Sequence, residues 1–293
     1  MNVSLPIVGS PSRAETALAC ERRHVLGDIV CRQPVQRDEG SMSVGTVVHA
    51  GAAAWWRTGD LSKVEQSIAE AYAKLGEMPF TCEWLQELGR QYAAQAKLCA
   101  VHSTGQIVAV EERVIVDLGP AAKLSFKIDR LTRDPWVLVD TKTKGKWGPA
   151  FERKWEAKWR RSVQQMLYQW AVRHEYGVRP AHFIEAVVKE LPTRVYYVPL
   201  PEWTDAQLEE VVREFVALCQ RDAALVASAM LPGGEVDVDR LLYLAATATR
   251  FNFDNCEAFN RPCQYLPLCL ANPAERLGLL LAEYEHVEPE YLE

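Results

Sequence analysis

Alternating apolar and polar residues dominate the middle of the chain. Three consecutive runs rich in apolar and β-branched residues are Ile107–Leu118, Lys123–Leu131 and Trp136–Thr143, and two more follow at His182–Glu190 and Arg194–Pro199. Side chains in a β-strand alternate between two faces, so such runs are typical of strands in a packed sheet. The pattern therefore predicts five strands in the central part of the chain.

Helical spacing of apolar residues replaces this alternation on both sides of the strands. We predict helices over Ala14–Val30, Val44–Arg57, Leu61–Leu75, Cys82–Val101, Glu152–Tyr176 and Thr204–Ser228. Gly177, directly after the fifth helix, is a typical helix stop. One helix separates the third strand from the fourth, which gives the order β-β-β-α-β-β. This order predicts an α/β fold with a mixed β-sheet core flanked by helices.

The chain contains no internal repeat and no low-complexity linker. We therefore predict a single domain over residues 1–278, followed by an acidic C-terminal tail over residues 279–293. Within the domain we expect a helical part at about 14–101, a strand-rich core at about 105–200, and a helical, cysteine-bearing part at about 201–278. The tail collects glutamates and is expected to be a solvated end.

The composition is that of an ordinary globular protein, with 293 residues of which 48% are hydrophobic and 25% charged. The first residues lack the charged-then-apolar pattern of a secretory signal, and no stretch approaches about 18 apolar residues in a row. We therefore expect neither secretion nor a membrane span, and a cytoplasmic location. Eight cysteines in a reducing compartment are more often metal ligands than disulfide partners.

The formal net charge of −6 hides a basic stripe between Lys142 and Arg161. Lys and Arg side chains follow phosphate backbones, and aromatic rings among them stack on bases, so the stripe predicts binding to nucleic acid, with single strands well suited. Trp155 and Trp159 are four apart on a predicted helix, and core packing is the simpler interpretation for that pair. The predicted DNA-binding residues are Lys144, Lys146, Trp147, Arg153, Lys154, Lys158, Arg160 and Arg161.

Two aspartates and a lysine stand on the second and third predicted strands. Asp140 and Lys142 are two residues apart, so a strand places them on one face, and the turn signal Asp134-Pro135 folds Asp129 back toward them. Carboxylates bind hard divalent cations, which polarise a phosphoryl group and activate water, and a lysine can stabilise the developing charge. The set predicts metal-assisted phosphodiester hydrolysis, although an Asp-x-Lys triplet alone also fits a solvated ion pair on a surface strand.

Three residues outside this triplet fit the same chemistry. His49 lies in a small, apolar, helical run and is either a metal ligand or a buried core histidine. Gln164 and Tyr168 are four residues apart and share one face of the helix after the strands. From that face they could reach back over the acidic residues, but an ordinary helix with a half-buried tyrosine gives the same pattern.

A cluster of cysteines lies near the C-terminus. Cys256, Cys263 and Cys269 fall within a short, proline-containing segment, where thiols suit metal or iron–sulfur ligation better than packing. A fourth ligand is missing locally, and Cys20 is the first candidate for it, with Cys31 second. The other cysteines are expected in the helical core: Cys82, Cys99 and Cys219.

In their order along the chain, these motifs resemble those of the PD-(D/E)XK nuclease superfamily, specifically its RecB-like branch with an iron–sulfur cluster. That branch includes the AddB nuclease domain and the CRISPR-associated nucleases of spacer acquisition. Its order is cysteine, histidine, aspartate, acid-x-lysine, Gln-x-x-x-Tyr and three cysteines. Over nearly the whole chain the same order is formed by Cys20, His49, Asp129, Asp140-Thr141-Lys142, Gln164, Tyr168, Cys256, Cys263 and Cys269.

The resemblance implies a restriction-endonuclease-like fold with an N-terminal helical elaboration and a C-terminal cysteine loop. It implies that Lys142 is the catalytic lysine and that Gln164 and Tyr168 line the DNA path. The implied ligands of Mg²⁺ or Mn²⁺ are His49, Asp129, Asp140 and the Thr141 carbonyl. The implied ligands of a structural [4Fe–4S] cluster are Cys20, Cys256, Cys263 and Cys269.

One position departs from the family pattern. The family often has glycine three residues before the first aspartate, and this chain has Phe126 there. A bulkier side chain at this point could narrow the substrate path, but it removes no ligand.

The function that follows from the resemblance is a metal-dependent DNA exonuclease of recombination, repair, phage DNA processing or CRISPR adaptation, with DNA and a recombination or adaptation protein as partners. The chain has no Gly-x-x-x-x-Gly-Lys-Ser/Thr helicase motif, which indicates a stand-alone nuclease or the nuclease part of a complex. Two other classes stay open. One is a DNA-binding or scaffolding protein that keeps the fold without cleavage, and the other is a structural zinc protein.

Overall fold

The computed structural model describes residues 7–34, 40–75, 80–98, 105–120, 122–145, 149–250, 252, 256 and 262–287. The chain divides into two compact units, each built from segments distant in sequence. Unit 1 comprises Met1–Arg37, Ile115–Ser125 and Glu209–Glu293, and unit 2 comprises Asp38–Val114 and Phe126–Leu208. The single domain expected from the sequence stays a prediction, and each unit is described by itself.

Five strands form the sheet of unit 2, with β4 and β3 continuing into unit 1. Their order is β4-β5-β6-β7, and β3 pairs with β4. The pair β5/β6 is parallel, whereas β4/β5 and β6/β7 are antiparallel, so the sheet is mixed as predicted. A parallel pair needs a long crossover, and two helices supply it between β5 and β6. The strands are β3 (Gln106–Asp117), β4 (Ala122–Arg133), β5 (Val137–Lys144), β6 (Ala181–Val188) and β7 (Val195–Pro199).

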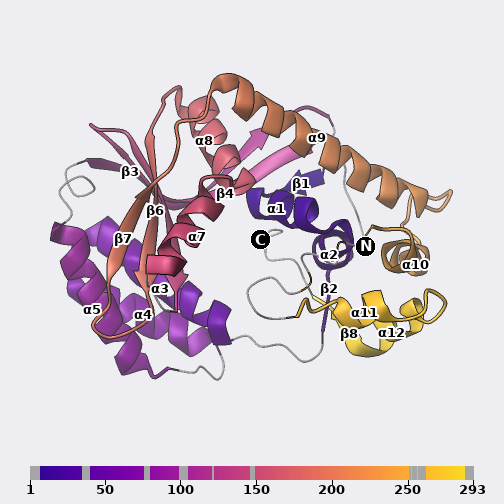
Figure 1. The fold of residues 1–293 in the computed structure, drawn as a ribbon, viewed down its shortest axis with the longest axis horizontal. Helices are drawn as coiled ribbons and strands as arrows, with labels where there is room; N and C mark the ends of the chain where they lie inside the picture. The colour runs from indigo at the N-terminus through magenta and orange to yellow at the C-terminus, as the bar shows by residue number, and fades with distance from the viewer. Residues whose placement is uncertain are drawn as a thin grey trace. The chain divides into compact units, whose positions relative to one another are not determined.

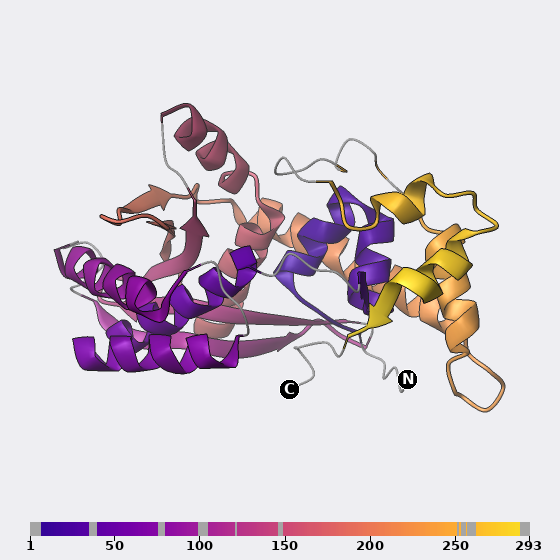
Figure 2. The ribbon, with the colours of Figure 1, turned by 90° about the horizontal axis from the view of Figure 1, so that it is seen from below.

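Three helices of unit 2 pack together along one side of these strands (Figures 1 and 2). They are α3 (Gly40–Thr58), α4 (Leu61–Lys74) and α5 (Cys82–Leu98). Their shared core includes Val47, Ile68 and Leu88, and it also contains Val187 of β6. Since successive strand residues point to opposite faces, Val187 and Glu185 identify the face of β6 that these helices cover.

The other face of β6 packs against α7 (Pro149–Trp159), the first of the two crossover helices, which is followed by α8 (Val163–Tyr176). Trp155 and Trp159 form a buried cluster with Ile184 and Ala186, which supports core packing for this tryptophan pair. The single helix predicted over Glu152–Tyr176 is wrong, because the chain starts a new helix after Ser162. The Ser162 side chain caps that helix by accepting a hydrogen bond from the Gln165 amide.

Unit 1 is mainly helical. Its helix α9 (Asp205–Ser228) begins in unit 2, and the helices α10 (Val238–Thr247), α11 (Leu266–Leu270) and α12 (Arg276–Glu283) follow. Strand β1 (Ile7–Gly9) pairs in parallel with the first residues of β4, and β2 (Arg32–Pro34) pairs with β8 (Tyr284–His286). The last part of α12 and all of β8 lie in the segment predicted to be an acidic tail, and residues 288–293 are outside the described residues.

The N-terminal helix predicted over Ala14–Val30 is divided into three pieces. These are α1 (Pro11–Ala19), α2 (Glu21–His24) and the π-helical segment η1 (Val25–Ile29). The first break falls at Cys20, whose φ of −162° and ψ of 110° are extended. An apolar 3.6-residue pattern cannot reveal such a break, because both helices continue the same spacing.

No helix among the described residues has the length and apolar character needed to cross a membrane.

Candidate active site

Strands β4 and β5 bring together the two aspartates and the lysine singled out in the sequence. The Lys142 ammonium lies 2.9 Å from Asp140 Oδ1 and 2.8 Å from Asp140 Oδ2, which confirms that the two side chains share one face. Asp129 accepts a 2.7 Å hydrogen bond from the Thr141 amide through its Oδ2. The acid-x-lysine triplet is therefore joined to Asp129 by a direct bond within unit 2.

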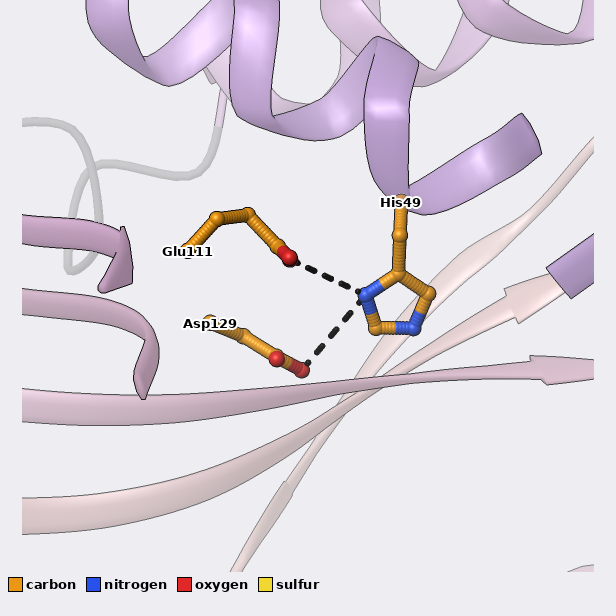
Figure 3. Close-up of side chains that lie close together, drawn as sticks. All are labelled: His49, Glu111 and Asp129. Carbon is orange, nitrogen blue, oxygen red and sulfur yellow. Dashed lines mark hydrogen bonds and ion pairs between the residues drawn. The ribbon is translucent and has the colours of Figure 1, made fainter. Parts of the chain in front are cut away.

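His49 reaches the same site from α3 (Figure 3). Its Nδ1 lies 3.2 Å from Glu111 Oε1 and 3.7 Å from Asp129 Oδ2. Among the described residues, His49, Glu111 and Asp129 form the group of potential metal ligands, with one atom of each within 4.8 Å of the others. Ligand atoms around one hard cation at roughly 2.0–2.6 Å lie at most about 4–5 Å apart, so this donor set fits such a cation.

Glu111 was missed by the sequence reasoning. It lies on β3, where its φ of 51° interrupts regular strand geometry, and its Oε2 pairs with Lys127 Nζ at 2.5 Å. No motif includes it, because its closeness to His49 and Asp129 arises from the folding of β3 beside β4. The run of glutamates at 111 and 112 was the only signal in the sequence, and it does not indicate which of the two faces the site.

The pKa values of two carboxylates of the site, Asp129 and Glu111, are shifted in opposite directions. Burial raises the pKa of Asp129 to about 6, and the neighbouring Asp140 charge adds to this, against the opposing influence of His49 and Lys142. For Glu111, burial is overcome by hydrogen bonds from His49 and Lys127, which lower its pKa. Negative charges packed this closely favour a positive partner.

The bases of the site remain positively charged more readily than in water. Burial by itself would lower the pKa of Lys142, but the charges of Asp140 and Asp129 raise it overall. Burial likewise opposes the charged form of His49, yet the hydrogen bond to Glu111 and the Asp129 charge raise its pKa. Lys142 is therefore a fixed cation beside Asp140, and it can stabilise negative charge that develops on a substrate.

Helix α8 supplies a side chain that binds Asp140, and it belongs to Gln165, which was not among the predicted residues. Gln165 donates a 3.1 Å hydrogen bond from Nε2 to Asp140 Oδ2, and its Oε1 is buried with no hydrogen-bond partner among the described residues. Gln164, the predicted residue, lies 3.4 Å from the Tyr168 hydroxyl. Tyr168 and Phe126 have ring centroids 5.7 Å apart. A small pocket here is lined by Phe126, Lys127, Ile128, Asp129, Leu138, Val139, Asp140 and Tyr168.

The basic stripe is described for six of its eight predicted residues. Lys144 is partly buried, and the other five are exposed: Arg153, Lys154, Lys158, Arg160 and Arg161. Lys158 Nζ lies 4.5 Å from the centroid of the Trp159 ring. Lys146 and Trp147 lie outside the described residues.

The four cysteines proposed as cluster ligands belong to unit 1, whereas Cys82 belongs to unit 2, and no disulfide joins the cysteines that the structure describes. Arg22 Nη1 lies 3.8 Å from Cys269 Sγ, and the Cys263 amide donates a 2.5 Å hydrogen bond to the Cys256 carbonyl. Burial raises the pKa of Cys269, and the nearby Cys20 and Cys263 raise it further. Arg22, two residues after Cys20, thus contacts Cys269, whereas the Cys31 thiol contacts the Asp28 carbonyl at 3.9 Å.

The chain is similar to one protein-family model and to solved structures. No curated protein matches the chain. Among solved structures, a provisionally named exonuclease from Eubacterium rectale is 15% identical and covers 88% of this chain and 87% of its own, with a TM-score of 0.47. The family model of the PD-(D/E)XK nuclease superfamily matches residues 9–269. Since that match spans most of the chain, the protein belongs to the PD-(D/E)XK nuclease superfamily.

Proposed function

We propose that this protein is a deoxyribonuclease that depends on Mg²⁺ or Mn²⁺ and removes nucleotides from DNA ends. The observation that carries the proposal is the hydrogen bond that joins the two halves of the site. Asp129 of the ligand group accepts it from the amide of Thr141, the residue between the ion-paired Asp140 and Lys142. Metal-assisted cleavage of a phosphodiester needs these two parts side by side: oxygen-rich ligands for a hard cation and a fixed positive charge beside them.

Each residue has a distinct part in this proposal. His49, Glu111 and Asp129 would hold the cation, and Asp140 and the Thr141 carbonyl would complete its surroundings. The cation would supply Lewis acidity toward the phosphoryl group. Lys142 offers its ammonium to the negative charge that grows on the phosphoryl oxygens, and Asp140 keeps that ammonium in place at 2.8–2.9 Å. Tyr168, beside the pocket next to Asp129, would contact the strand that is cut.

The exposed cations of α7 and the turn after it would guide the strand toward this site. Arg153, Lys154 and Lys158 lie on α7, and Arg160 and Arg161 follow it directly. Because α7 packs on the face of β6 that also carries Ile184, the register partner of Asp140, the stripe and the acid-lysine pair belong to the same side of the sheet. This placement supports DNA as the substrate.

A [4Fe–4S] cluster held by Cys20, Cys256, Cys263 and Cys269 is the second part of the proposal. The contact of Arg22, two residues after Cys20, with Cys269 supports it, as does the bond between the backbones of Cys256 and Cys263. Arg22 beside Cys269 provides a positive charge for thiolates. The cluster would join the break between α1 and α2 to the C-terminal segment of unit 1.

The nuclease proposal is tested by cleavage of end-labelled single- and double-stranded DNA with Mg²⁺, with Mn²⁺ and with a chelator. We expect metal-dependent release of nucleotides from the ends. Lys142→Ala should lower the rate at least about a hundredfold, as is typical when one charge-stabilising donor is lost. Lys63→Ala is the matched control, since Lys63 is an exposed lysine on α4 that contacts Gln66.

Equal rates for Lys142→Ala and wild type would contradict the assigned lysine. DNA binding without cleavage in both proteins would instead identify a DNA-binding protein that keeps the nuclease fold. Cleavage that persists in the chelator would contradict the role of the cation.

The cluster is tested by the iron and sulfide content of protein purified without oxygen. We expect about four iron atoms per chain and a brown colour. Cys263→Ala should lose both, whereas Cys82→Ala, which removes a half-exposed thiol of α5 in unit 2, should keep them. Stoichiometric zinc in a colourless protein would contradict the cluster and support a zinc site.

A further inference from the structure

A buried carboxylate lies behind the candidate active site, on the face of the sheet that α3–α5 cover. Glu185 of β6 is fully buried, with 0% of its surface exposed. A buried charge is costly unless it is paired and hydrogen-bonded, so its partners indicate what it does. None of the residues that bind it was singled out in the sequence except Thr141.

Three hydroxyl groups donate to this carboxylate. Tyr92 Oη lies 2.8 Å and Thr141 Oγ1 3.0 Å from Oε2, and Tyr197 Oη lies 2.7 Å from Oε1. Thr141, Glu185 and Tyr197 are register partners across β5, β6 and β7, so they form one row across three strands. Burial and the Glu185 charge raise the pKa of Tyr92, which keeps its hydroxyl protonated as a donor.

Strand β4 joins the row through a buried arginine. Arg130 is 2% exposed, and its Nη2 lies 3.6 Å from Glu185 Oε1. Its guanidinium stacks 3.7 Å from the centroid of the Trp56 ring, and Trp56 Nε1 donates a 2.7 Å hydrogen bond to Tyr92 Oη. The guanidinium nitrogens have no hydrogen-bond partner among the described residues. Its position is thus fixed by Glu185 and Trp56 together.

Two strands of this row, β4 and β5, carry a site residue directly beside the row member. Arg130 follows Asp129, and Thr141 stands between Asp140 and Lys142. Adjacent strand residues point to opposite faces, so the row lies behind the site while sharing its backbone. Thr141 connects the two faces, because its hydroxyl binds Glu185 and its amide binds Asp129 Oδ2.

The bond between Thr141 and Asp129 is important because the backbone pairing of β4 with β5 stops short of these residues. The pairing runs from Thr132 opposite Val137 to Arg130 opposite Val139. Beyond that point Asp129, rather than a β4 carbonyl, accepts the Thr141 amide. The relative position of Asp129 and Asp140 therefore depends on Thr141, and the position of Thr141 depends on Glu185.

We propose that Glu185 and Thr141 are positioning residues that act from behind the sheet to hold Asp129 and Asp140 at the separation that a divalent cation requires. This inference rests on the proposed metal-dependent nuclease, and it assigns neither residue a contact with the DNA through its side chain. Supporting groups behind metal ligands are typically worth about ten- to a hundredfold in metal affinity.

The test compares wild type with Thr141→Val, Thr141→Ser and Glu185→Gln. Calorimetric titration with Mn²⁺ measures metal affinity, and hydrogen exchange of the Thr141 amide, without metal, measures the bond to Asp129. We expect Thr141→Val to lose about tenfold or more in affinity and to exchange faster, and Thr141→Ser, which restores the hydroxyl, to regain both. Glu185→Gln should fall between them, because an amide oxygen can still accept from Thr141.

Tyr197→Phe is the matched control, since it removes one hydrogen bond to Glu185 that does not lead to the site. It should leave Mn²⁺ affinity and exchange at residue 141 within about twofold of wild type. Equal affinity and exchange in Thr141→Val and wild type would overturn the proposal and leave the row a purely structural element. If wild type bound no Mn²⁺, the nuclease proposal would fail, while the exchange of the Thr141 amide would still decide the link to Asp129.

Discussion

At the scale of single residues, the site combines groups that depend on one another. Asp140 binds Lys142 on one side and Gln165 on the other, and Asp129 binds the Thr141 amide. A buried side chain that binds two partners tolerates little change around it, because replacing either partner leaves a buried polar atom without a hydrogen bond. Gln165 is well suited to a test of the site, because its Oε1 has no hydrogen-bond partner among the described residues and its Nε2 binds Asp140.

Gln165→Leu should slow cleavage by about ten- to a hundredfold with little change in DNA affinity. A hydrogen bond to a charged group contributes about 1.5–3 kcal/mol, and this bond orients Asp140 rather than contacting the strand. Rates under single-turnover conditions, together with equilibrium DNA binding, separate the two effects. The control is Gln66→Leu on α4, and a loss of DNA affinity equal to the loss of rate would contradict an orienting role.

The residues of the site differ in how far sequence alone could reveal them. Asp140 and Lys142 were predictable because strand alternation fixes their relative direction over two residues. Glu111 and Gln165 were not, because each reaches the site from an element whose placement depends on tertiary packing. Gln164 was singled out by its four-residue spacing to Tyr168, which sets neighbours on the helix but not the face turned toward Asp140.

At the scale of elements, helix packing in unit 2 depends on close approach at two glycines. A Cβ added at Gly89 of α5 would lie 2.4 Å from Ile68 Cδ1, and one added at Gly51 of α3 would lie 2.9 Å from the same atom. Ile68 of α4 therefore fills space that the two neighbouring helices leave open by lacking side chains. This packing holds α3, and with it His49, beside the sheet.

Gly89→Ala should lower the free energy of unfolding by about 1–2 kcal/mol. Overpacking a core costs about 1–3 kcal/mol, and the better helix propensity of alanine offsets at most about 1 kcal/mol. Gly278→Ala in α12 is the matched control, because nothing lies within 4 Å of an added Cβ there. That variant should be unchanged or more stable by up to about 1 kcal/mol in urea unfolding. A stabilised Gly89→Ala would contradict the packing of Ile68.

A second element-scale feature is His24, which ties α2 to η1 and α9 within unit 1. Its Nδ1 lies 2.9 Å from Asp28 Oδ2 and its Nε2 lies 2.9 Å from Asp222 Oδ2. Burial by itself would lower its pKa, but the hydrogen bonds and charges of Asp222 and Asp28 raise it to about 9 from 6.5. The imidazolium is therefore part of the fold near neutral pH.

The stabilisation by His24 should disappear at alkaline pH. Since its pKa is raised in the folded state, the contribution is complete below about pH 6.5 and is lost as the pH rises through about 9. The difference in unfolding free energy between wild type and His24→Gln should shrink by on the order of 3 kcal/mol from pH 6 to pH 10. Asp222→Asn should remove most of the same dependence, and a difference that is constant with pH would contradict a charged His24.

At the scale of the whole molecule, the succession of strands and of a helical crossover along the chain was predictable from hydrophobic periodicity, but the division of that crossover into α7 and α8 was not. All five predicted strands are present with boundaries shifted by at most two residues. The three short strands β1, β2 and β8 were not predicted, since three residues are too few to show alternation. The division of the chain into two units was equally hidden, because strands β3 and β4 pass from one unit to the other without any linker.

The affinity for DNA should fall steeply with salt concentration, with a slope set by how many cations of the exposed stripe contact phosphates. Replacing Arg153, Lys154 and Arg160 by alanine should reduce the slope of log affinity against log salt by about 2–3, since each phosphate contact contributes roughly 0.7–0.9. Alanine at Lys63, Lys74 and Lys97, exposed on α4 and α5, is the matched control and should leave the slope unchanged. Equal slopes for the two triple variants would contradict a DNA path along α7.

The interleaving of the two units has a consequence for the order in which the protein is made on the ribosome. All residues of unit 2 precede Glu209, whereas unit 1 needs the segment Glu209–Glu293, which carries Cys256, Cys263 and Cys269. At roughly 5–20 residues per second, that segment takes several seconds to emerge. During this interval the residues proposed to cut DNA have already been synthesised, whereas three of the proposed cluster ligands have not. The proposed cluster would therefore form only after this segment has been made, and iron delivery would be a late step in the maturation of the protein.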